Sequence, residues 1–201
     1  MKLYDFTFAP NPRKVRVYLA EKGIRVPMQN VDLMKGEQRS PEFLGKNPLG
    51  VVPVLELDDG TIIPESLAII EYFEETHPEP PLIGTDPVTR ARVRAWERRA
   101  ELGVLSLAAT IFRHTNKFFA DRVEQNPRVA EAARKDLTAR LAWMNDDLDG
   151  RDWLAGKFSI ADITLLIGVD FAGVSKYALD PSWKNLIRWH EAMKARPSAA
   201  A

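Results

Sequence analysis

The chain has 201 residues, with 28 basic and 28 acidic side chains, so its formal net charge at pH 7 is zero. A balanced charge gives no overall electrostatic case for binding nucleic acid or an anionic membrane. The absence of cysteine excludes disulfide bonds, thiolate metal sites and a cysteine nucleophile. No apolar run approaches the ~20 residues of a membrane span, and the N-terminus has no signal-peptide pattern, so we expect a cytoplasmic protein.

The first third of the chain alternates strand and helix signals. Residues 2–6 predict a short strand, and Asn11 followed by Pro12 is typical of an N-cap and a first helical position. The helix is expected to end at Gly23, and residues 26–33 predict a second strand. A polar connection with a short helical piece follows.

The stretch NPLGVVPVLELDDGTIIPES, residues 47–66, predicts a β-hairpin that leads into a helix. The apolar run 54–57 reads as a buried strand, Asp59-Gly60 is a hairpin turn signal, and 61–63 is the returning strand. A helical pattern then runs from Ser66 to about residue 76. The resulting order, βαβ, loop, ββα, is compatible with an α/β thioredoxin-like domain.

The second half of the chain is predicted to be an all-α helical bundle. A proline-rich segment, residues 79–87, predicts a stiff linker between a domain at 1–78 and a domain at 88–201. We expect a frayed tail at 197–201. Helical patterns follow the linker at 87–119, 127–148, 159–177 and 182–195.

The two ends of the hairpin carry the chemistry. Ser66 occupies an N-cap position, where its hydroxyl and the free N–H groups of the first helical turn suit a carboxylate. Glu65 can receive an ammonium group, so the pair suits the head group of an amino acid. A proline after Val52 is often cis in a tight turn, and a cis Val52-Pro53 bond would leave the Val52 N–H and C=O free for an extended peptide. Together these features predict a small γ-linked peptide as the ligand.

The stretch 47–66, together with MKLY at the start, RVYLAEKG at 16–23 and FSIAD at 158–162, resembles the cytosolic glutathione S-transferase family. The resemblance covers the whole chain. It implies the thioredoxin-like and helical domains, glutathione as co-substrate without a metal, and a homodimer. It also implies that Val52-Pro53 and Glu65-Ser66 bind glutathione, and that Gln38 and Arg39 lie where relatives hold its glycine carboxylate, with Lys46 as a weaker third.

The chain departs from the family at the catalytic position. Relatives supply a serine, cysteine or tyrosine that stabilises the glutathione thiolate, whereas Ala9, Pro10 and Asn11 stand there in this chain. Asn11 has an amide donor that can point at sulfur, and an N-cap role for it can coexist with catalysis. Thr7 is the nearest hydroxyl. Asn11, Thr7 and backbone N–H groups therefore remain the candidate donors.

The helix predicted at 87–119 has an aromatic end, where relatives build the pocket for the hydrophobic co-substrate. Phe112 and His114 are the candidate pocket residues, although an aromatic cluster at helical spacing is more often part of a core. His77 and His190 lack partners at metal-ligand spacing, so no metal site is expected.

Ser159-Ile-Ala-Asp162 predicts a capping box at the start of a helix, with a structural role. From this local pattern alone, replacing Asp162 by alanine is expected to cost about 1 kcal/mol of stability.

The reaction that the resemblance implies is transfer of the glutathione thiolate to a small hydrophobic electrophile. Two rivals remain: a glutathione- or ligand-binding protein with little catalysis, which the missing hydroxyl favours, and a transferase-like scaffold for a protein partner. A glutaredoxin-like reductase would need a cysteine. A glutathione-dependent isomerase is disfavoured because the chain lacks a Ser-Ser-Cys sequence.

Overall fold

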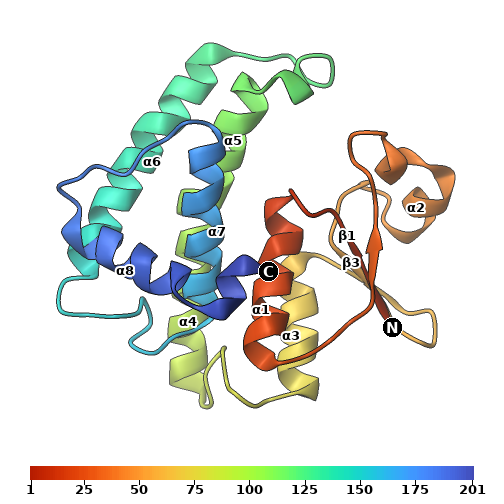
Figure 1. Ribbon diagram of the computed structural model, residues 1–201, viewed down its shortest axis with the longest axis horizontal. Helices are drawn as coiled ribbons and strands as arrows, with labels where there is room; N and C mark the ends of the chain where they lie inside the picture. The colour runs from red at the N-terminus through yellow and green to blue at the C-terminus, as the bar shows by residue number, and fades with distance from the viewer. The chain divides into compact units, whose positions relative to one another are not determined.

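The computed structural model describes all residues, 1–201, and the chain divides into two compact units. Unit 1 contains residues 1–80 and 200–201, and unit 2 contains residues 81–199 (Figure 1). The division between Pro80 and Pro81 falls within the segment 79–87 that the sequence predicts as a linker. None of the helices is both long and apolar enough to cross a membrane.

Unit 1 is a four-stranded mixed sheet with helices, which confirms the predicted thioredoxin-like order. The strand order is β2-β1-β3-β4; β1 pairs with β2 in parallel, whereas the β1–β3 and β3–β4 pairs are antiparallel. The second strand is shorter than predicted. The elements are β1 (Lys2–Asp5), α1 (Pro10–Lys22), β2 (Met28–Asn30), the 3-10 helix η1 (Glu37–Arg39), α2 (Pro41–Lys46), β3 (Val54–Glu56), β4 (Ile62–Pro64) and α3 (Ser66–Thr76).

Helices α1 and α3 are joined by a buried polar contact as well as by apolar packing. The Tyr18 hydroxyl donates to Glu74 Oε2 at 2.7 Å, and Lys22 Nζ lies 2.7 Å from the same carboxylate. Lys22 also donates to the His77 carbonyl, at the end of α3. Burial, followed by the hydrogen bond and charge of Glu74, raises the pKa of Tyr18, so this phenol stays protonated and donating.

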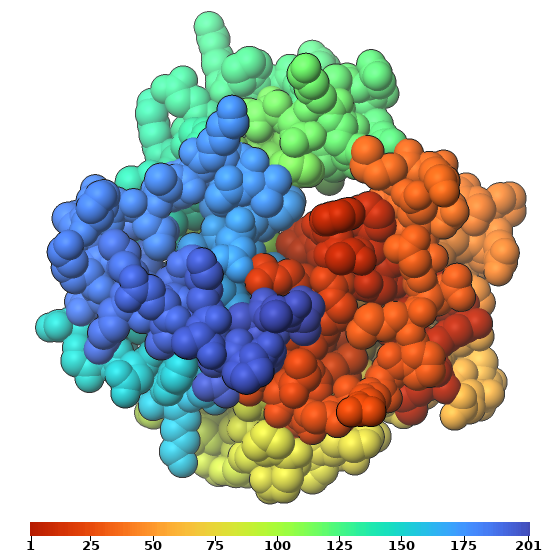
Figure 2. All heavy atoms as spheres, in the orientation of Figure 1, coloured from red at the N-terminus to blue at the C-terminus, as the bar shows by residue number.

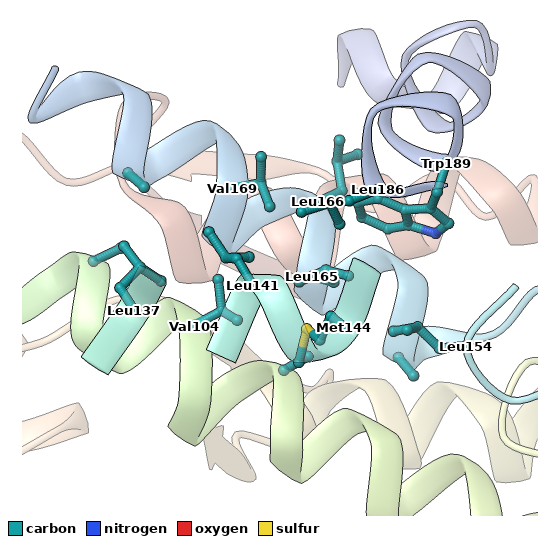
Figure 3. Packing of buried hydrophobic residues seen from close by; sticks show 14 of the residues in the cluster. Val104, Leu137, Leu141, Met144, Leu154, Leu165, Leu166, Val169, Leu186 and Trp189 are labelled. Carbon is teal, nitrogen blue, oxygen red and sulfur yellow. The ribbon is translucent and has the colours of Figure 1, made fainter. Parts of the chain in front are cut away.

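Unit 2 is all-helical, as predicted. Its core gathers apolar side chains from most of its helices, including Leu137, Leu141 and Met144 of α6 and Leu165 of α7 (Figure 3). The elements are α4 (Pro87–Ala100), the π-helical segment η2 (Glu101–Leu105), α5 (Ser106–Thr115), the 3-10 helix η3 (Lys117–Phe119), α6 (Pro127–Asp147), α7 (Ile160–Val174), α8 (Lys184–Lys194) and the 3-10 helix η4 (Pro197–Ala200). The last residue of η4, Ala200, belongs to unit 1.

The long helix predicted at 87–119 consists of α4, η2 and α5 in sequence, and it ends at Thr115. It ends there because the Asn116 side chain accepts a hydrogen bond from the Phe118 N–H and starts η3. At η2 the helix passes very close to α7: a Cβ atom added to Gly168 would lie 2.9 Å from Val104 Cγ1. Any larger residue at 168 would therefore push the two helices apart.

The capping box at Ser159 is confirmed, and Asp162 does more than close it. Asp162 accepts hydrogen bonds from the backbone of Ser159 and Leu154 and from the Trp189 indole, at 3.0–3.1 Å. This side chain is fully buried, so burial raises its pKa to about 6 although these donors favour the charged form. Asp162 therefore joins α7 to α8 and to the loop at Leu154.

The predicted frayed tail at 197–201 is wrong. Residues Pro197–Ala200 form a 3-10 helix, and Ser198 is buried. Just before it, the Arg196 guanidinium lies 3.8 Å from the centre of the Phe158 ring. This cation–π contact fixes the start of the 3-10 helix on the loop that precedes α7.

Candidate functional site

The topology of unit 1 brings four segments to one end of its sheet. Val54 pairs with Pro64, so the residues before β3 and the residues after β4 meet at the same edge. Tyr4 also pairs with Val54, which places the loop after β1 at that edge, and parallel β2 ends there too. In Figure 2, red atoms from the start of the chain and orange atoms from residues near 40 border each other on the visible face of unit 1. Most of the predicted glutathione-site residues thus converge from separate parts of the sequence.

The Val52-Pro53 peptide bond is cis, as predicted. Neither the N–H nor the C=O of Val52 has an intramolecular hydrogen-bond partner, whereas the adjacent Val51 carbonyl accepts from the Asn47 side chain at 2.9 Å. Asn47 also accepts from the Leu49 N–H, so its side chain holds the turn that precedes Val52. The backbone of Val52 is therefore available to pair with an extended peptide.

Ser66 is not the N-cap of α3, and that prediction is wrong. The cap position belongs to Glu65, which has the unusual backbone angles φ 70° and ψ 123°, and Ser66 is the first helical residue. The first hydrogen bond of the helix runs from the Ile69 N–H to the Glu65 carbonyl, so the N–H groups of the first turn are unpaired. The Ser66 hydroxyl also has no partner. The correction strengthens the case for a carboxylate ligand, because no donor is used for capping.

The backbone of Glu65 adopts a conformation that L-residues other than glycine rarely use. Strain of this kind costs about 1–3 kcal/mol and is found mainly where it positions a functional group. The Glu65 side chain is exposed, beside the buried Ser66. The geometry thus presents a carboxylate and a hydroxyl from consecutive residues.

Gln38 and Arg39 reach the same end of the sheet through a close approach to Gly50. A Cβ atom added to Gly50 would lie 2.8 Å from the Gln38 carbonyl oxygen and 3.0 Å from Arg39 Nη1, so only glycine fits there. Gly50 also has a φ of 62°, which glycine adopts without strain. Gln38 Oε1 is buried without a hydrogen-bond partner, and such an atom is a candidate acceptor for a ligand N–H.

Asn11 is not an N-cap either. Helix α1 begins at Pro10 with Ala9 as its cap residue, so Asn11 is the second helical residue, exposed and without a side-chain hydrogen bond. Its neighbours Pro10 and Pro12 have no N–H, and Arg13 already donates to the Ala9 carbonyl. The first turn of α1 therefore offers one free backbone N–H, that of Asn11. Both this N–H and the Asn11 amide are available donors at the positive end of the helix.

Sequence reasoning missed the pair formed by Arg16 and Asp5. Arg16 Nη1 lies 2.5 Å from Asp5 Oδ1, and both side chains are more than nine-tenths buried. Arg16 Nη2 also donates to the Thr7 carbonyl at 2.8 Å. Arg16 thus fixes the loop between β1 and α1 from inside the domain. The signal available in the sequence was an acidic residue at the end of β1 and a basic residue eleven positions later.

Two family models match the chain. The N-terminal domain of glutathione S-transferase matches residues 3–81, and the C-terminal domain of glutathione S-transferase matches residues 97–197. The chain belongs to the glutathione S-transferase family. Glutathione S-transferase 2 of Saccharomyces cerevisiae is 37% identical over 98% of this chain and 87% of that protein.

Other relatives show that membership of the glutathione S-transferase family leaves the reaction open. Maleylacetoacetate isomerase of Pseudomonas aeruginosa is 44% identical, over 47% of this chain and 45% of that protein. Among solved structures, a glutathione S-transferase domain-containing protein of Marinobacter aquaeolei superposes with a TM-score of 0.94 at 38% identity. That match covers 98% of this chain and 99% of the other, so the whole fold is shared.

Lys46, the weaker candidate for the glycine carboxylate of glutathione, already has a partner within the chain. Its Nζ donates to Glu56 Oε2 at 2.8 Å, and the Tyr4 hydroxyl donates to the same oxygen at 2.7 Å. The hydrogen bond from Lys46, followed by that from Tyr4, lowers the pKa of Glu56. Glu56 is two residues further along β3 than Val54 and lies away from the Val52 end. Lys46 is therefore already paired, outside the Val52 end of the sheet.

The two candidate residues for the co-substrate pocket of a transferase lie on α5 in unit 2. Phe112 is half-buried and contacts Phe119 and Phe171, with ring centres 5.7 and 5.0 Å apart. His114 Nδ1 accepts a hydrogen bond from the Asn126 N–H at 3.2 Å. This contact places the imidazole proton on Nε2, so His114 presents an N–H donor there.

Neither a metal-binding group nor a surface hollow adds residues to the site. No three His, Asp or Glu side chains are grouped so as to hold a metal ion. A shallow hollow of about 410 Å³ in unit 2, between α6 and the connection from α7 to α8, contains none of the predicted residues.

Proposed function

We propose that this protein is a glutathione transferase that conjugates the glutathione thiolate to small, hydrophobic electrophiles. The observation that carries the proposal is the set of unpaired groups at one end of the unit 1 sheet: the Val52 backbone, the Ser66 hydroxyl and the first-turn N–H groups of α3. A peptide with an α-amino acid head can use all of them at once. Membership of the family supports the same ligand.

In this proposal the γ-glutamyl carboxylate binds to Ser66 and the α3 N-terminus, and its ammonium binds to Glu65. The Val52 backbone pairs with the cysteinyl unit, beside Pro53. Gln38 and Arg39 bind the glycine end. Arg39 Nη1 already reaches the Leu49 carbonyl at 3.4 Å, next to the turn that leads to Val52.

The thiolate is stabilised by the Asn11 amide and the Asn11 backbone N–H. A thiol with an ordinary pKa near ~8.5 is mostly protonated at pH 7, so donors aimed at sulfur raise the thiolate fraction. Because Pro10 and Pro12 remove the other donors of the first turn, Asn11 is the main source of this stabilisation. The proton leaves to solvent, the sulfur attacks the electrophilic carbon, and the leaving group departs with its electron pair. Phe112 and His114 belong to the pocket for the electrophile.

The test combines a calorimetric titration with glutathione and a turnover assay with 1-chloro-2,4-dinitrobenzene. Ser66→Ala is expected to lose affinity for glutathione. Asn11→Ala is expected to bind glutathione but to lose turnover by about a hundredfold, the usual effect of removing one such donor. Thr7→Val is a matched control, because it removes the other nearby hydroxyl, and it is expected to keep turnover.

The absence of a hydroxyl at residues 9–11 favours one second candidate, a glutathione-dependent binding protein with little catalysis. Glutathione binding without turnover in the parent protein would support that candidate. Absence of glutathione binding would reject both functions.

We also infer a homodimer in the cytoplasm, as is typical of the family. Light scattering coupled to size-exclusion chromatography tests the dimer, and a mass of 22.7 kDa, that of one chain, would reject it.

A further inference from the structure

The hollow on the surface of unit 2 contains none of the residues assigned to glutathione or to the electrophile. It lies between α6 and residues 175–183, the connection that joins α7 to α8 (Figure 1). Its volume of about 410 Å³ is within the ~300–1,000 Å³ that small-molecule sites occupy. Its lining combines the aromatic rings of Tyr177 and Trp183 with the Thr138 hydroxyl and the Asp180 carboxylate. The hollow therefore has the size and the mixed chemistry of a ligand site.

Hydrogen bonds fix the connection at both ends of the hollow. Arg134 Nη2 of α6 donates to the Ser175 carbonyl at 2.7 Å, and the Tyr177 N–H donates to a carbonyl in the last turn of α7. At the other end, the Asp180 carbonyl accepts from the Trp183 N–H at 3.0 Å. Both aromatic side chains are half-buried and pack on the apolar core of unit 2. The walls of the hollow are thus formed before a ligand binds, which lowers the ordering cost of binding.

The Tyr177 hydroxyl can offer a ligand only an acceptor. Thr138 Oγ1 donates to the Arg134 carbonyl at 2.9 Å, and this contact uses the single hydrogen of the Thr138 hydroxyl. The hydroxyl oxygens of Thr138 and Tyr177 are 2.8 Å apart, so Tyr177 is the donor in the contact between them. The Tyr177 oxygen keeps lone pairs but has no hydrogen left to donate. It suits a ligand that brings N–H groups.

Asp180 carries a negative charge that no basic side chain of the chain pairs with. Its Oδ1 atom accepts from the Ser182 N–H at 2.8 Å, and the carboxylate forms no ion pair. Hydrogen bonding by Ser182, first through its N–H and then through its side chain, lowers the pKa of Asp180, so this carboxyl group is charged at pH 7. Lys176 and Lys184 belong to the same segment, but both are exposed and neither lies over an aromatic ring of the hollow. The carboxylate and the ring faces are therefore available to a cation from outside the chain.

We propose that this hollow binds a small organic ammonium ion with an aromatic body, of the arylalkylamine class. The ammonium N–H groups donate to the Asp180 carboxylate and to the Tyr177 oxygen. The positive charge is attracted to the faces of the two aromatic rings, and the aromatic body of the ligand packs on Trp183. An anion of the same shape is repelled by the carboxylate. This site is separate from the glutathione site and does not depend on the proposed transferase function.

The test uses three probes that share a phenyl ring and a two-carbon chain: the 2-phenylethylammonium cation, neutral 2-phenylethanol and the 3-phenylpropanoate anion. Each is titrated at pH 7 into ¹⁵N-labelled protein, and the indole N–H signals are followed by NMR. The chain has five tryptophans, and Trp183→Phe identifies the signal of residue 183 by its loss. We expect the cation to shift this signal with a Kd on the order of 1 mM, as suits a shallow site. The alcohol is expected to bind at least about tenfold more weakly, and the anion not at all.

The informative variant is Asp180→Asn, which removes the charge and keeps an oxygen for the Ser182 N–H. Its affinity for the cation is expected to fall about tenfold, with unchanged affinity for the alcohol. Tyr177→Phe keeps the ring and removes the acceptor oxygen, so we expect a loss of about threefold for the cation. Asp121→Asn is the charge-matched control: Asp121 is exposed and precedes α6, whereas Thr138 lies about 17 Å along that helix. It is expected to leave binding of the cation unchanged.

Three results would overturn the inference. The first is binding of the alcohol or the anion as tightly as the cation, which would make the hollow a site without charge preference or an anion site. The second is an unchanged affinity of Asp180→Asn for the cation. The third is an unmoved Trp183 signal at a cation concentration about ten times the expected Kd. Glutathione binding and turnover are measured separately on the same proteins, so failure of the transferase function leaves this test intact.

Discussion

Ser159 caps α7 and Ser66 is the first residue of α3, and the two serines are used in opposite ways. At the start of α7, the Ser159 hydroxyl accepts from the Ala161 N–H and contacts Asp162, and the Asp162 carboxylate is paired in turn. At the start of α3, the Ser66 hydroxyl and the first-turn N–H groups have no partner in the chain. Paired polar groups stabilise a fold, whereas unpaired ones at a helix N-terminus are free to bind an anion.

The local sequence explains part of this difference. The third residue after Ser159 is Asp162, which can return a hydrogen bond to the cap backbone, whereas the third residue after Ser66 is Ile69, which cannot. The backbone explains the rest. Ser159 has an extended conformation, with φ −156°, and its side chain reaches back over the helix, while Glu65 before Ser66 turns with φ 70°.

The largest expected effect is the loss of stability in Asp162→Ala. The change leaves the N–H groups of Leu154, Ser159 and Trp189 buried without an acceptor, so we expect a loss of about 3–5 kcal/mol rather than the ~1 kcal/mol of a local cap. Urea unfolding followed by tryptophan fluorescence measures it, because all five tryptophans lie in unit 2. A loss near ~1 kcal/mol would mean that only the cap matters.

The pH dependence of the same carboxyl group gives the next largest effect. The pKa of Asp162 is about 6 in the folded protein against 3.8 for the free side chain, so folding favours the protonated form. This contribution is fully present below pH 4 and is lost as the pH rises through 6. The stability of the parent relative to Asp162→Asn should therefore fall by about 3 kcal/mol between pH 3 and 7. A relative stability that increases with pH would show that the hydrogen bonds outweigh burial.

Replacement of each serine by alanine tests the comparison directly. Ser66→Ala is expected to weaken glutathione binding by about 10- to 100-fold, the value of one hydrogen bond to a charged group, with little change in stability. Ser159→Ala should do the reverse, with a stability loss of about 1 kcal/mol and unchanged affinity. Calorimetry and urea unfolding of both variants provide the four values. Equal destabilisation by the two changes would contradict a free hydroxyl at Ser66.

The smallest expected effect concerns the backbone of Glu65. Glu65→Gly relieves the unfavourable φ, so we expect a gain of about 0.5–1 kcal/mol in stability, with weaker glutathione binding. Glu65→Gln is the matched control, because it removes the charge and keeps the backbone strain. It should lose affinity without gaining stability. Unit 1 contains no tryptophan, so circular dichroism is the appropriate measurement.

The sequence by itself was enough to predict the thioredoxin-like order, the helical second half and the capping box at Ser159. These features depend on neighbours in the chain: turn residues, apolar periodicity and caps spaced by three residues. The family also followed from local motifs. The short-range patterns failed at Asn11 and Ser66, because α1 begins two residues earlier and α3 one residue earlier than caps at these positions predict.

Only the tertiary structure decided which polar groups have a partner within the chain and which remain unpaired. Strand pairing brings Gln38, Val52 and Ser66 to one end of the sheet, and Gly50 allows the loop at 38–39 to approach. Lys46 donates a hydrogen bond to Glu56, and Arg16 forms an ion pair with Asp5. Asp162 accepts a hydrogen bond from Trp189 on another helix. Each of these contacts joins residues distant in sequence, and a hydrogen bond depends on atomic separation in the folded chain, which local pattern does not encode.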